Sequence, residues 1–277
     1  MLIRILRNSL ILFYNPIKFI SKVNDFVKRY LVQYILNNKL PIFYKNKKIF
    51  MIRNFGAISK MRASSFEIKE PETLRWIQGF KENSSLLDIG ANIGIYSLFA
   101  AYKGHLVKSI EPDALNYALL NLNIKDNFYQ DKITAYPYSI HSETGTAKLN
   151  IGDYEWGGAM SSFDRELDWK GRKMNVQFTQ GSAGISIDDF CNNTNFIPNH
   201  IKIDVDGNEL LVLKGAMKTL QNLDLKSILI ELYKDHHEYN ECLKIIKNNN
   251  FLLSEATHSA IYDKDDLRTD NYIFIRD

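Results

Sequence analysis

Residues 86–94 read Leu-Leu-Asp-Ile-Gly-Ala-Asn-Ile-Gly, an apolar strand that runs into an acidic, glycine-containing turn. Glu111 follows Gly90 by 21 residues, at the end of the next predicted strand. Glycines let a backbone bend sharply and approach a ligand, and an acid at that second strand end can accept hydrogen bonds from ribose hydroxyls. The stretch therefore predicts a nucleoside-binding turn at the edge of an α/β sheet.

The turn favours S-adenosylmethionine over a dinucleotide. A dinucleotide fingerprint reads Gly-x-Gly-x-x-Gly, and its backbone amides bind a pyrophosphate. Here the pattern is Asp-x-Gly-x-x-x-Gly, and the carboxylate of Asp88 would repel a diphosphate. S-adenosylmethionine carries an ammonium and a sulfonium beside its ribose, so we expect it to be the cofactor.

Predicted strands and helices alternate on both sides of this turn, which is typical of a parallel α/β sheet. The predicted strands cover residues 85–89, 106–111, 132–136, 185–187, 200–205, 226–232, 250–255 and 271–275. The predicted helices cover residues 94–103, 113–124, 208–220 and 235–248, with a short helix from Asp188. Residues 66–277 are thus expected to form one enzymatic domain.

Residues 144–183 interrupt this alternation with glycines between short alternating stretches, which predicts a β excursion or flap. Long insertions in compact domains are often functional. Trp156, Phe163 and Trp169 could supply a stacking surface for an acceptor, and we take Trp156 as a candidate substrate-binding residue. Simple surface elaboration explains the insertion equally well.

Residues 1–65 are predicted to form a basic helical arm and a hairpin, the latter over residues 41–53. The first 49 residues hold ten Lys or Arg and one acid, Asp25, whereas the remainder holds 25 basic and 31 acidic residues. The arm therefore carries a charge of about +9 (10 − 1) and the rest about −6 (25 − 31). A protein body with a net negative charge is not expected to bind nucleic acid.

Apolar residues recur at three- and four-residue steps after Pro16, which predicts an amphipathic helix. They are Ile17, Ile20, Val23, Val27, Tyr30, Leu31 and Tyr34. Such a stripe is expected to pack on the body, because helix stripes are more often buried against protein than against lipid. The alternative is a peripheral contact of residues 1–40 with an anionic membrane.

Export and membrane spanning are not expected. The apolar run 10–14 is far shorter than the ~20 residues of a spanning helix. Arg4 and Arg7 resemble the start of a signal peptide, but no adequate apolar stretch or cleavage site follows. The two cysteines suit a reducing compartment. We therefore expect a cytoplasmic protein that is either free or peripheral on the inner face of the membrane.

Carboxylates mark four predicted strand ends, where ligands bind in open α/β sheets. They are Asp88, Glu111, Asp204 and Glu231. Asp204 belongs to a block, residues 201–209, that ends in three acids. Glu209 can stabilise a helix N-terminus and Asp206 can form a turn, but Asp204 has no such structural explanation.

These motifs resemble the FkbM-type family of S-adenosylmethionine-dependent methyltransferases. The matching segments are residues 87–94, 111–112, 187–190, 201–209, 214–215 and 230–231, together with residues 70–71 and 271–274. The block Ile-Lys-Ile-Asp-Val-Asp-Gly at residues 201–207 makes the resemblance specific, although Asp206 and Asn208 depart from the residues usual there. The resemblance implies a class I Rossmann-like mixed sheet closed by an antiparallel terminal strand, and methylation of hydroxyl groups.

The resemblance also implies roles for individual residues. Asp88, Gly90, Asn92 and Gly94 should hold the methionine part of the donor, and Glu111 its ribose. Ser139 and Ile140 should line the adenine.

Asp204 is the first candidate for the catalytic base or for an acceptor-orienting carboxylate, because a sugar hydroxyl is a weak acid. His236 and His237 are alternates, and Asp206 and Glu231 are candidates for substrate binding. Asp204, Asp206 and Glu231 could instead hold a divalent metal, which we do not favour.

The sequence thus favours an O-methyltransferase acting on a sugar, a glycan or a lipid-linked saccharide. One alternative is a methyltransferase of nucleic acid or of a small metabolite. The other is a membrane-surface module that binds the donor without turnover.

Overall fold

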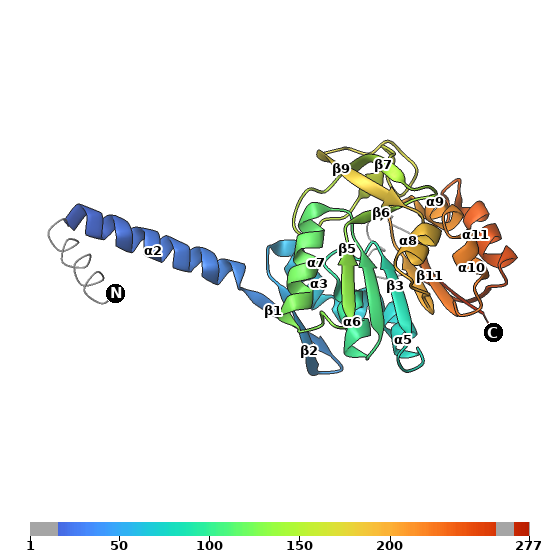
Figure 1. Ribbon diagram of the computed structural model, residues 1–277, viewed down its shortest axis with the longest axis horizontal. Coiled ribbons are helices and arrows are strands. Elements are labelled where there is room, and N and C mark those ends of the chain that lie inside the picture. The colour runs from blue at the N-terminus through green and yellow to red at the C-terminus, as the bar shows by residue number, and fades with distance from the viewer. Residues whose placement is uncertain (1–15, 259–268, 277) are drawn as a thin grey trace.

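The computed structural model describes residues 16–258 and 269–276, with side chains from Lys22 onward, so residues 4–14, discussed above, lie outside it. Seven strands form the central sheet in the order β12-β13-β11-β10-β3-β4-β5 (Figure 1). They are β3 (Ser85–Ile89), β4 (Leu106–Ile110), β5 (Ile133–Tyr136), β10 (His200–Ile203), β11 (Ser227–Tyr233), β12 (Leu252–His258) and β13 (Thr269–Ile275). Only β13 is antiparallel to its neighbours, which confirms the predicted Rossmann-like mixed sheet.

Helices cover both faces of this sheet, and the period of two along each strand decides which core a side chain enters. In β3, Leu87 and Ile89 enter the core formed with α8 (Ile187–Asn193), α9 (Glu209–Lys214), α10 (Met217–Gln221) and α11 (Tyr239–Asn248). Leu86 enters the opposite core, formed with α5 (Pro71–Gln78), α6 (Ile95–Tyr102) and α7 (Ala114–Asp126). Asp88 shares the face of Leu86.

Three predicted elements differ in their bounds. The helix expected over residues 208–220 is two helices, α9 and α10, separated at Gly215 and Ala216, where a Cβ on Gly215 would meet the carbonyl oxygen of His141 at 2.2 Å. The helix expected from residue 235 begins at Tyr239, after a turn. Of the strand expected at residues 185–187, only Ile185 lies in a strand, at the end of β9 (Phe178–Ile185), which pairs outside the central sheet; Ser186 is the N-cap of α8 and Ile187 its first residue.

The predicted β excursion is a separate four-stranded sheet in the order β6-β9-β7-β8. Besides β9 it contains β6 (Tyr138–Ile140), β7 (Gly145–Ile151) and β8 (Ser161–Phe163). It lies beyond the carboxyl ends of β3, β4 and β5 (Figure 1). This position places the insertion next to the edge at which ligands bind in open α/β sheets.

The predicted hairpin is present as β1 (Lys39–Tyr44) and β2 (Lys47–Arg53), joined at Lys45 and Asn46, whose positive φ angles suit a tight hairpin turn. It packs on the body, because Ile42, Phe50 and Ile52 belong to the core with α6 and α7. Two short helices, α3 (Ala57–Ser64) and α4 (Phe66–Lys69), then lead to α5.

Helix α2 (Pro16–Leu36) projects away from the body (Figure 1). All of its residues from Lys22 to Leu36 are exposed. The expectation that its apolar stripe packs on the body is therefore wrong for this part of the helix. None of the described helices is long and apolar enough to cross a membrane.

Asparagines of α7 attach the free edge of β2 to the body. The side chain of Asn123 is fully buried; its Oδ1 accepts from the backbone amide of Arg53 at 2.8 Å, and its Nδ2 donates to the carbonyl oxygen of Ile93 at 2.8 Å. Asn127, the C-cap of α7, accepts from the amide of Met51 at 2.8 Å and donates to the carbonyl oxygen of the same residue at 2.7 Å. These side chains satisfy backbone groups that an edge strand leaves unpaired.

We expect Asn123→Ala to lower the free energy of unfolding by about 2–4 kcal/mol, because it leaves a buried amide and a buried carbonyl without partners. Urea unfolding followed by circular dichroism measures this loss. Asn121→Ala, on the exposed side of the same helix, is the matched control and should change stability by less than about 0.5 kcal/mol. Equal effects of the two substitutions would contradict the role given to Asn123.

Candidate active site

A cavity lies at the carboxyl ends of β3, β4, β10 and β11, beneath the β excursion. Eight of the predicted site residues line it: Gly90, Asn92, Glu111, Ser139, Ile140, Asp204, Asp206 and Glu231. Phe163 and Trp169, two of the three aromatic residues expected to form a stacking surface, also line it, together with Arg62, Lys69, Asn116 and Met160, which no motif in the sequence marks. The structure thus brings together, from segments far apart in the chain, most of the residues expected at one site.

The turn after β3 is held close to β10. Gly90 has a φ of +77°, and a Cβ at this position would lie 1.7 Å from the carbonyl oxygen of Asp204. The amides of Gly90 and Ala91 both donate to the carbonyl oxygen of Ile110, at 3.0 and 2.9 Å. Only glycine fits this close approach, which opens the turn toward the cavity.

The insertion closes over this turn. The carbonyl oxygen of Gly158 accepts from the side-chain amides of Asn92 and Asn116, at 2.6 and 3.0 Å. The guanidinium of Arg62 donates to the carbonyl oxygen of Gly157 at 2.8 Å. The segment that follows β7 is therefore a roof over the predicted donor site.

Glu111 is buried beside the turn, with 5% of its surface exposed. Its two carboxylate oxygens accept from the backbone amides of Asn92 and Asp113, at 2.7 and 2.9 Å. Burial raises the pKa of Glu111 to about 8, although these two hydrogen bonds oppose the rise. When a bound ligand favours the ionised form of Glu111, its carboxylate can accept hydrogen bonds from the hydroxyl groups of that ligand.

The structure does not bring Asp88 or Gly94 to the cavity. Asp88 is 1% exposed and faces the core, where it accepts a hydrogen bond from the hydroxyl of Ser97. Burial raises its pKa, and the nearby Lys202 ammonium opposes the rise. Gly94, with a φ of +85°, is the N-cap of α6. Their geometry supports a role in shaping the turn rather than direct contact with the donor.

Ser139 and Ile140 lie on β6, and both are buried where they line the cavity. The hydroxyl of Ser139 is 3.0 Å from that of Ser182 on β9. Their position beyond the end of β5 matches the expected adenine side of the donor pocket.

The carboxylates on the opposite side of the cavity differ in their partners. Asp204 lies 2.6 Å from the Nζ of Lys202. Burial alone would raise the pKa of Asp204, but Lys202 lowers it below its ordinary value. Asp206 accepts from the amides of Met160 and Ser161 in the roof, and burial together with the charge of Asp204 raises its pKa to about 6.

Glu231 is a further carboxyl group of this cavity whose pKa is raised. Burial and the like charges of Asp204 and Glu70 raise its pKa well above the ordinary value. One of its oxygens accepts from the hydroxyl of Thr269 at 3.1 Å. A proton acceptor for a weakly acidic hydroxyl needs such a raised pKa, whereas the lowered pKa of Asp204 makes it a poor base.

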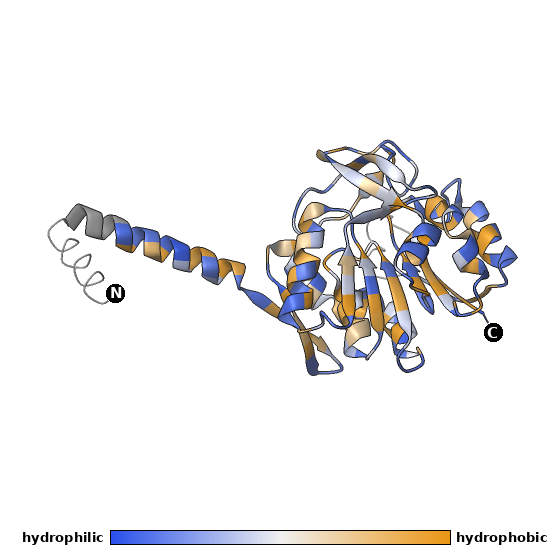
Figure 2. Cartoon of the chain, in the orientation of Figure 1, coloured by the Kyte–Doolittle hydropathy of each residue, from blue (hydrophilic) through white to orange (hydrophobic). Residues whose placement is uncertain are grey.

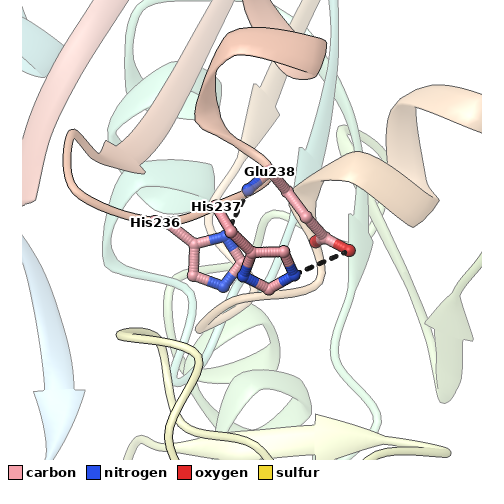
Figure 3. A group of neighbouring side chains, drawn as sticks. All are labelled: His236, His237 and Glu238. Atoms are coloured by element: carbon pink, nitrogen blue, oxygen red, sulfur yellow. Dashed lines mark hydrogen bonds and ion pairs between the residues drawn. The ribbon is translucent and has the colours of Figure 1, made fainter.

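His236 and His237, the alternates for the base, do not line this cavity. They lie in the turn between β11 and α11 next to Glu238 (Figure 3). The Nδ1 of His236 accepts from the amide of Glu238 at 3.2 Å, and the Nε2 of His237 is 3.8 Å from the carboxylate of Glu238. Arg165 also pairs with that carboxylate, at 3.2 Å. This turn therefore lies apart from the cavity at the strand ends, where the predicted donor and acceptor sites lie.

The proposed carboxylate ligands of a metal already have protein partners: Lys202 for Asp204, roof amides for Asp206, and Thr269 for Glu231. Within residues 16–258 and 269–276, only His236, His237 and Glu238 place three potential ligand atoms within 4.8 Å of one another. The cavity carboxylates are therefore better suited to organic cations and hydroxyl groups than to a metal.

Trp156 does not reach the cavity. Its ring packs edge-on against Phe55, with centroids 5.0 Å apart, beside the N-terminal core. Trp169, from the same insertion, lines the cavity and packs against Tyr233. Arg62 and Lys69 come from α3 and α4, where no motif in the sequence marks them.

Donor affinity should rise with pH up to about 8. Because Glu111 is protonated below this pKa in the free protein and ribose hydroxyls bind its ionised form, binding must release a proton. Titration calorimetry with S-adenosylhomocysteine should show up to tenfold tighter binding per pH unit between pH 6 and 7.5. Glu111→Gln should bind weakly with no such slope, and an unchanged slope in that variant would contradict the assignment.

The sequence profile described as the Methyltransferase FkbM domain matches residues 88–253, more than half of the chain. No curated protein matches. The similar solved structures include an S-adenosylmethionine-dependent methyltransferase from Agrobacterium tumefaciens, with a TM-score of 0.50, 10% identity, and coverage of 87% of this chain and 71% of that one.

Two further structures are the fibrillarin of Aeropyrum pernix, with natively bound S-adenosyl-L-methionine, and the magnesium protoporphyrin IX methyltransferase of Synechocystis. Their TM-scores are 0.46 and 0.47, each at 10% identity, with coverage of 87% and 81% of this chain and 84% and 86% of theirs. At such identity a likeness extends to the fold alone.

The profile match begins at the carboxyl end of β3 and includes the ends of β4, β10 and β11, which border the cavity. The donor side of that cavity has an open glycine turn, a buried carboxyl group and an excess of acidic residues, and this suits a cationic nucleoside. The chain therefore belongs to the FkbM methyltransferase family, and its cofactor is S-adenosylmethionine.

Proposed function

We propose that this enzyme is an O-methyltransferase whose acceptor is a hydroxyl group of a sugar, a glycan or a lipid-linked saccharide. The observation that carries the proposal is the set of carboxyl groups that share the cavity with the donor turn: Asp204, Asp206 and Glu231. Carboxylates accept hydrogen bonds from hydroxyl groups and can remove their protons. Trp169 adds an aromatic wall on which a sugar ring can pack.

S-adenosylmethionine supplies an electrophilic methyl group on a positively charged sulfur. The acceptor oxygen forms a bond to this methyl carbon as the carbon–sulfur bond breaks, and the acceptor proton passes to Glu231. Asp204, kept ionised by Lys202, orients the hydroxyl through a hydrogen bond. The roof formed by residues 153–160 excludes water, and the fixed alignment supplies part of the rate enhancement.

A nucleic-acid acceptor fits these features less well. The acidic side of the cavity would repel phosphates, and the chain after residue 49 carries a net charge of about −6 (25 − 31). The strand end at residues 204–207 also lacks the amide-containing Asn/Asp-Pro-Pro-aromatic turn that suits an exocyclic amine. A module that binds the donor without turnover is distinguished by the first experiment below.

We expect methyl transfer from labelled S-adenosylmethionine to members of a panel of glycosides, oligosaccharides and lipid-linked saccharides. The product should be a methyl ether, identified by mass spectrometry and stable to alkaline hydrolysis. The same panel should include tRNA and duplex DNA. Labelling of nucleic acid alone, or tight donor binding without transfer to any acceptor, would overturn the proposal.

Glu231→Gln is expected to lower kcat about 10²–10⁴-fold, because it removes the proton acceptor. In the unmodified enzyme kcat should rise with pH as Glu231 ionises, and Glu231→Gln should abolish that rise. Asp204→Asn should move this rise in kcat to lower pH. After burial, the charge of Asp204 is the largest cause of the raised pKa of Glu231.

Donor binding measured by calorimetry controls for folding in both variants. If Glu231→Gln keeps full turnover while Asp204→Asn loses it, Asp204 is the base and the assignment is reversed.

A further inference from the structure

The most prominent feature that methyl transfer does not use is the exposed apolar face of α2. At 100° per residue, six of its apolar side chains fall within an arc of about 140°. They are Val23, Phe26, Val27, Tyr30, Leu31 and Tyr34, and all are exposed, with 70% of the Phe26 surface and 68% of the Tyr34 surface accessible. Figure 2 shows hydrophobic and hydrophilic positions alternating along the projecting helix. An apolar face of this size indicates an interaction surface.

The polar face of the same helix is basic. Lys22, Lys28 and Arg29 lie outside the apolar arc, together with Asn24, Asp25 and Gln33, although Val32, Ile35 and Leu36 interrupt this face with exposed apolar side chains. Asp25 is the single acid among residues 1–49, which carry ten Lys or Arg. Long basic side chains can lie along an apolar surface while their charged ends reach anionic groups. The partner that complements both faces is therefore apolar inside and negatively charged at its surface.

A second copy of the helix does not provide this complement. Coiled-coil pairs have a narrow apolar seam flanked by Glu and Lys residues that form salt bridges between the helices. Here the apolar arc is wider than such a seam, and one acid per helix cannot neutralise its neighbour's basic residues. Two arms of about +9 each (10 − 1) would repel one another.

We propose that α2 docks on the surface of an anionic phospholipid bilayer. The helix lies in the plane of the headgroups, with its apolar arc in the acyl boundary and its lysines and arginine among the phosphates. Tyr30 and Tyr34 suit that depth, because a tyrosine ring is apolar and its hydroxyl group is polar. The docking is independent of the acceptor proposed above.

The elements next to α2 connect this surface with the active site. Strand β1 follows α2 directly and forms a groove with α3 and α4, which Phe43 and Ile68 line with exposed apolar side chains. Arg62 and Lys69, from the same two helices, line the cavity. One wall of the active site is therefore shared with the face of the body nearest to the docking helix.

Co-sedimentation of the full-length protein with vesicles tests the proposal. Vesicles that contain 30 mol% phosphatidylglycerol in phosphatidylcholine should bind the protein about a hundredfold more strongly than phosphatidylcholine alone, given about fivefold for each of three basic residues near the surface. Raising the salt concentration from 50 to 500 mM should reduce binding, because salt screens these charges.

Two variants with the same charge change separate the apolar face from the charge. Val27→Glu with Leu31→Glu places two acids on the apolar arc and should lower the partition coefficient at least tenfold. Asn24→Glu with Gln33→Glu adds the same charge just outside the two edges of the apolar arc and should lower the partition coefficient less. All four residues are exposed, so donor binding should be unchanged in both variants.

Equal loss in the two variants would show that charge alone drives binding and would overturn the docking mode. Absence of binding by the unmodified protein, together with a dimer in light scattering that Val27→Glu with Leu31→Glu dissociates, would show that a second copy covers the helix. Methyl transfer to a soluble saccharide is measured separately, so failure of docking leaves the proposed reaction standing.

Discussion

The ammonium of Lys202 determines the charge state of the active site. It is 1% exposed on the central strand β10, and attraction to Asp204, Glu70 and Asp88 raises its pKa even though burial opposes this. Lys202 lowers the pKa of Asp204, and Lys69, which lies 3.1 Å from Glu70, lowers the pKa of Glu70 together with Lys202. The negative charges of Asp204 and Glu70 in turn help to raise the pKa of Glu231. Two lysines thus divide neighbouring acids into fixed charges and a group that can exchange a proton, which is how paired carboxyl groups acquire different roles.

The backbone couples the two halves of the site equally closely. The amide of Asp204 donates to the carbonyl oxygen of Ile89, and the space beside Gly90 is filled by the carbonyl group of Asp204. Asn92 then connects the turn to Glu111 through its amide and to the roof through its side chain. The donor turn, the roof and the orienting carboxylate can therefore shift only together. Such mutual fixing favours a reaction that depends on alignment.

Features that depend on a local sequence pattern, such as turns and strands, could be predicted from the sequence. Features that depend on how side chains pack in the folded chain could not. The glycine turn, the strand ends and the terminal antiparallel strand have periodic or motif signals, and they predicted the sheet and the positions of Glu111 and Asp204. Side-chain direction has no such signal: Asp88 alternates into the core, and Trp156 packs on Phe55 while Trp169 reaches the cavity. Arg62 and Lys69 arrive from elements outside every motif, and the raised pKa of Glu231 follows from burial and neighbouring charges that only the folded chain creates.

Hydrogen bonds at the junction between α2 and the hairpin orient the end of the helix relative to the enzyme body. Arg53 of β2 donates to the carbonyl oxygen of Leu36 and to the side chain of Asn37, and the same guanidinium pairs with Asp126 of α7. These hydrogen bonds therefore attach the end of the helix to the enzyme body, so the helix is not joined to it by a free linker. Docked as proposed, a helix of 21 residues, about 30 Å long, would limit the heights and tilts of the active-site opening above a surface. Substrates confined to that layer would meet the enzyme at a high effective concentration, and those in bulk solution would gain nothing from it.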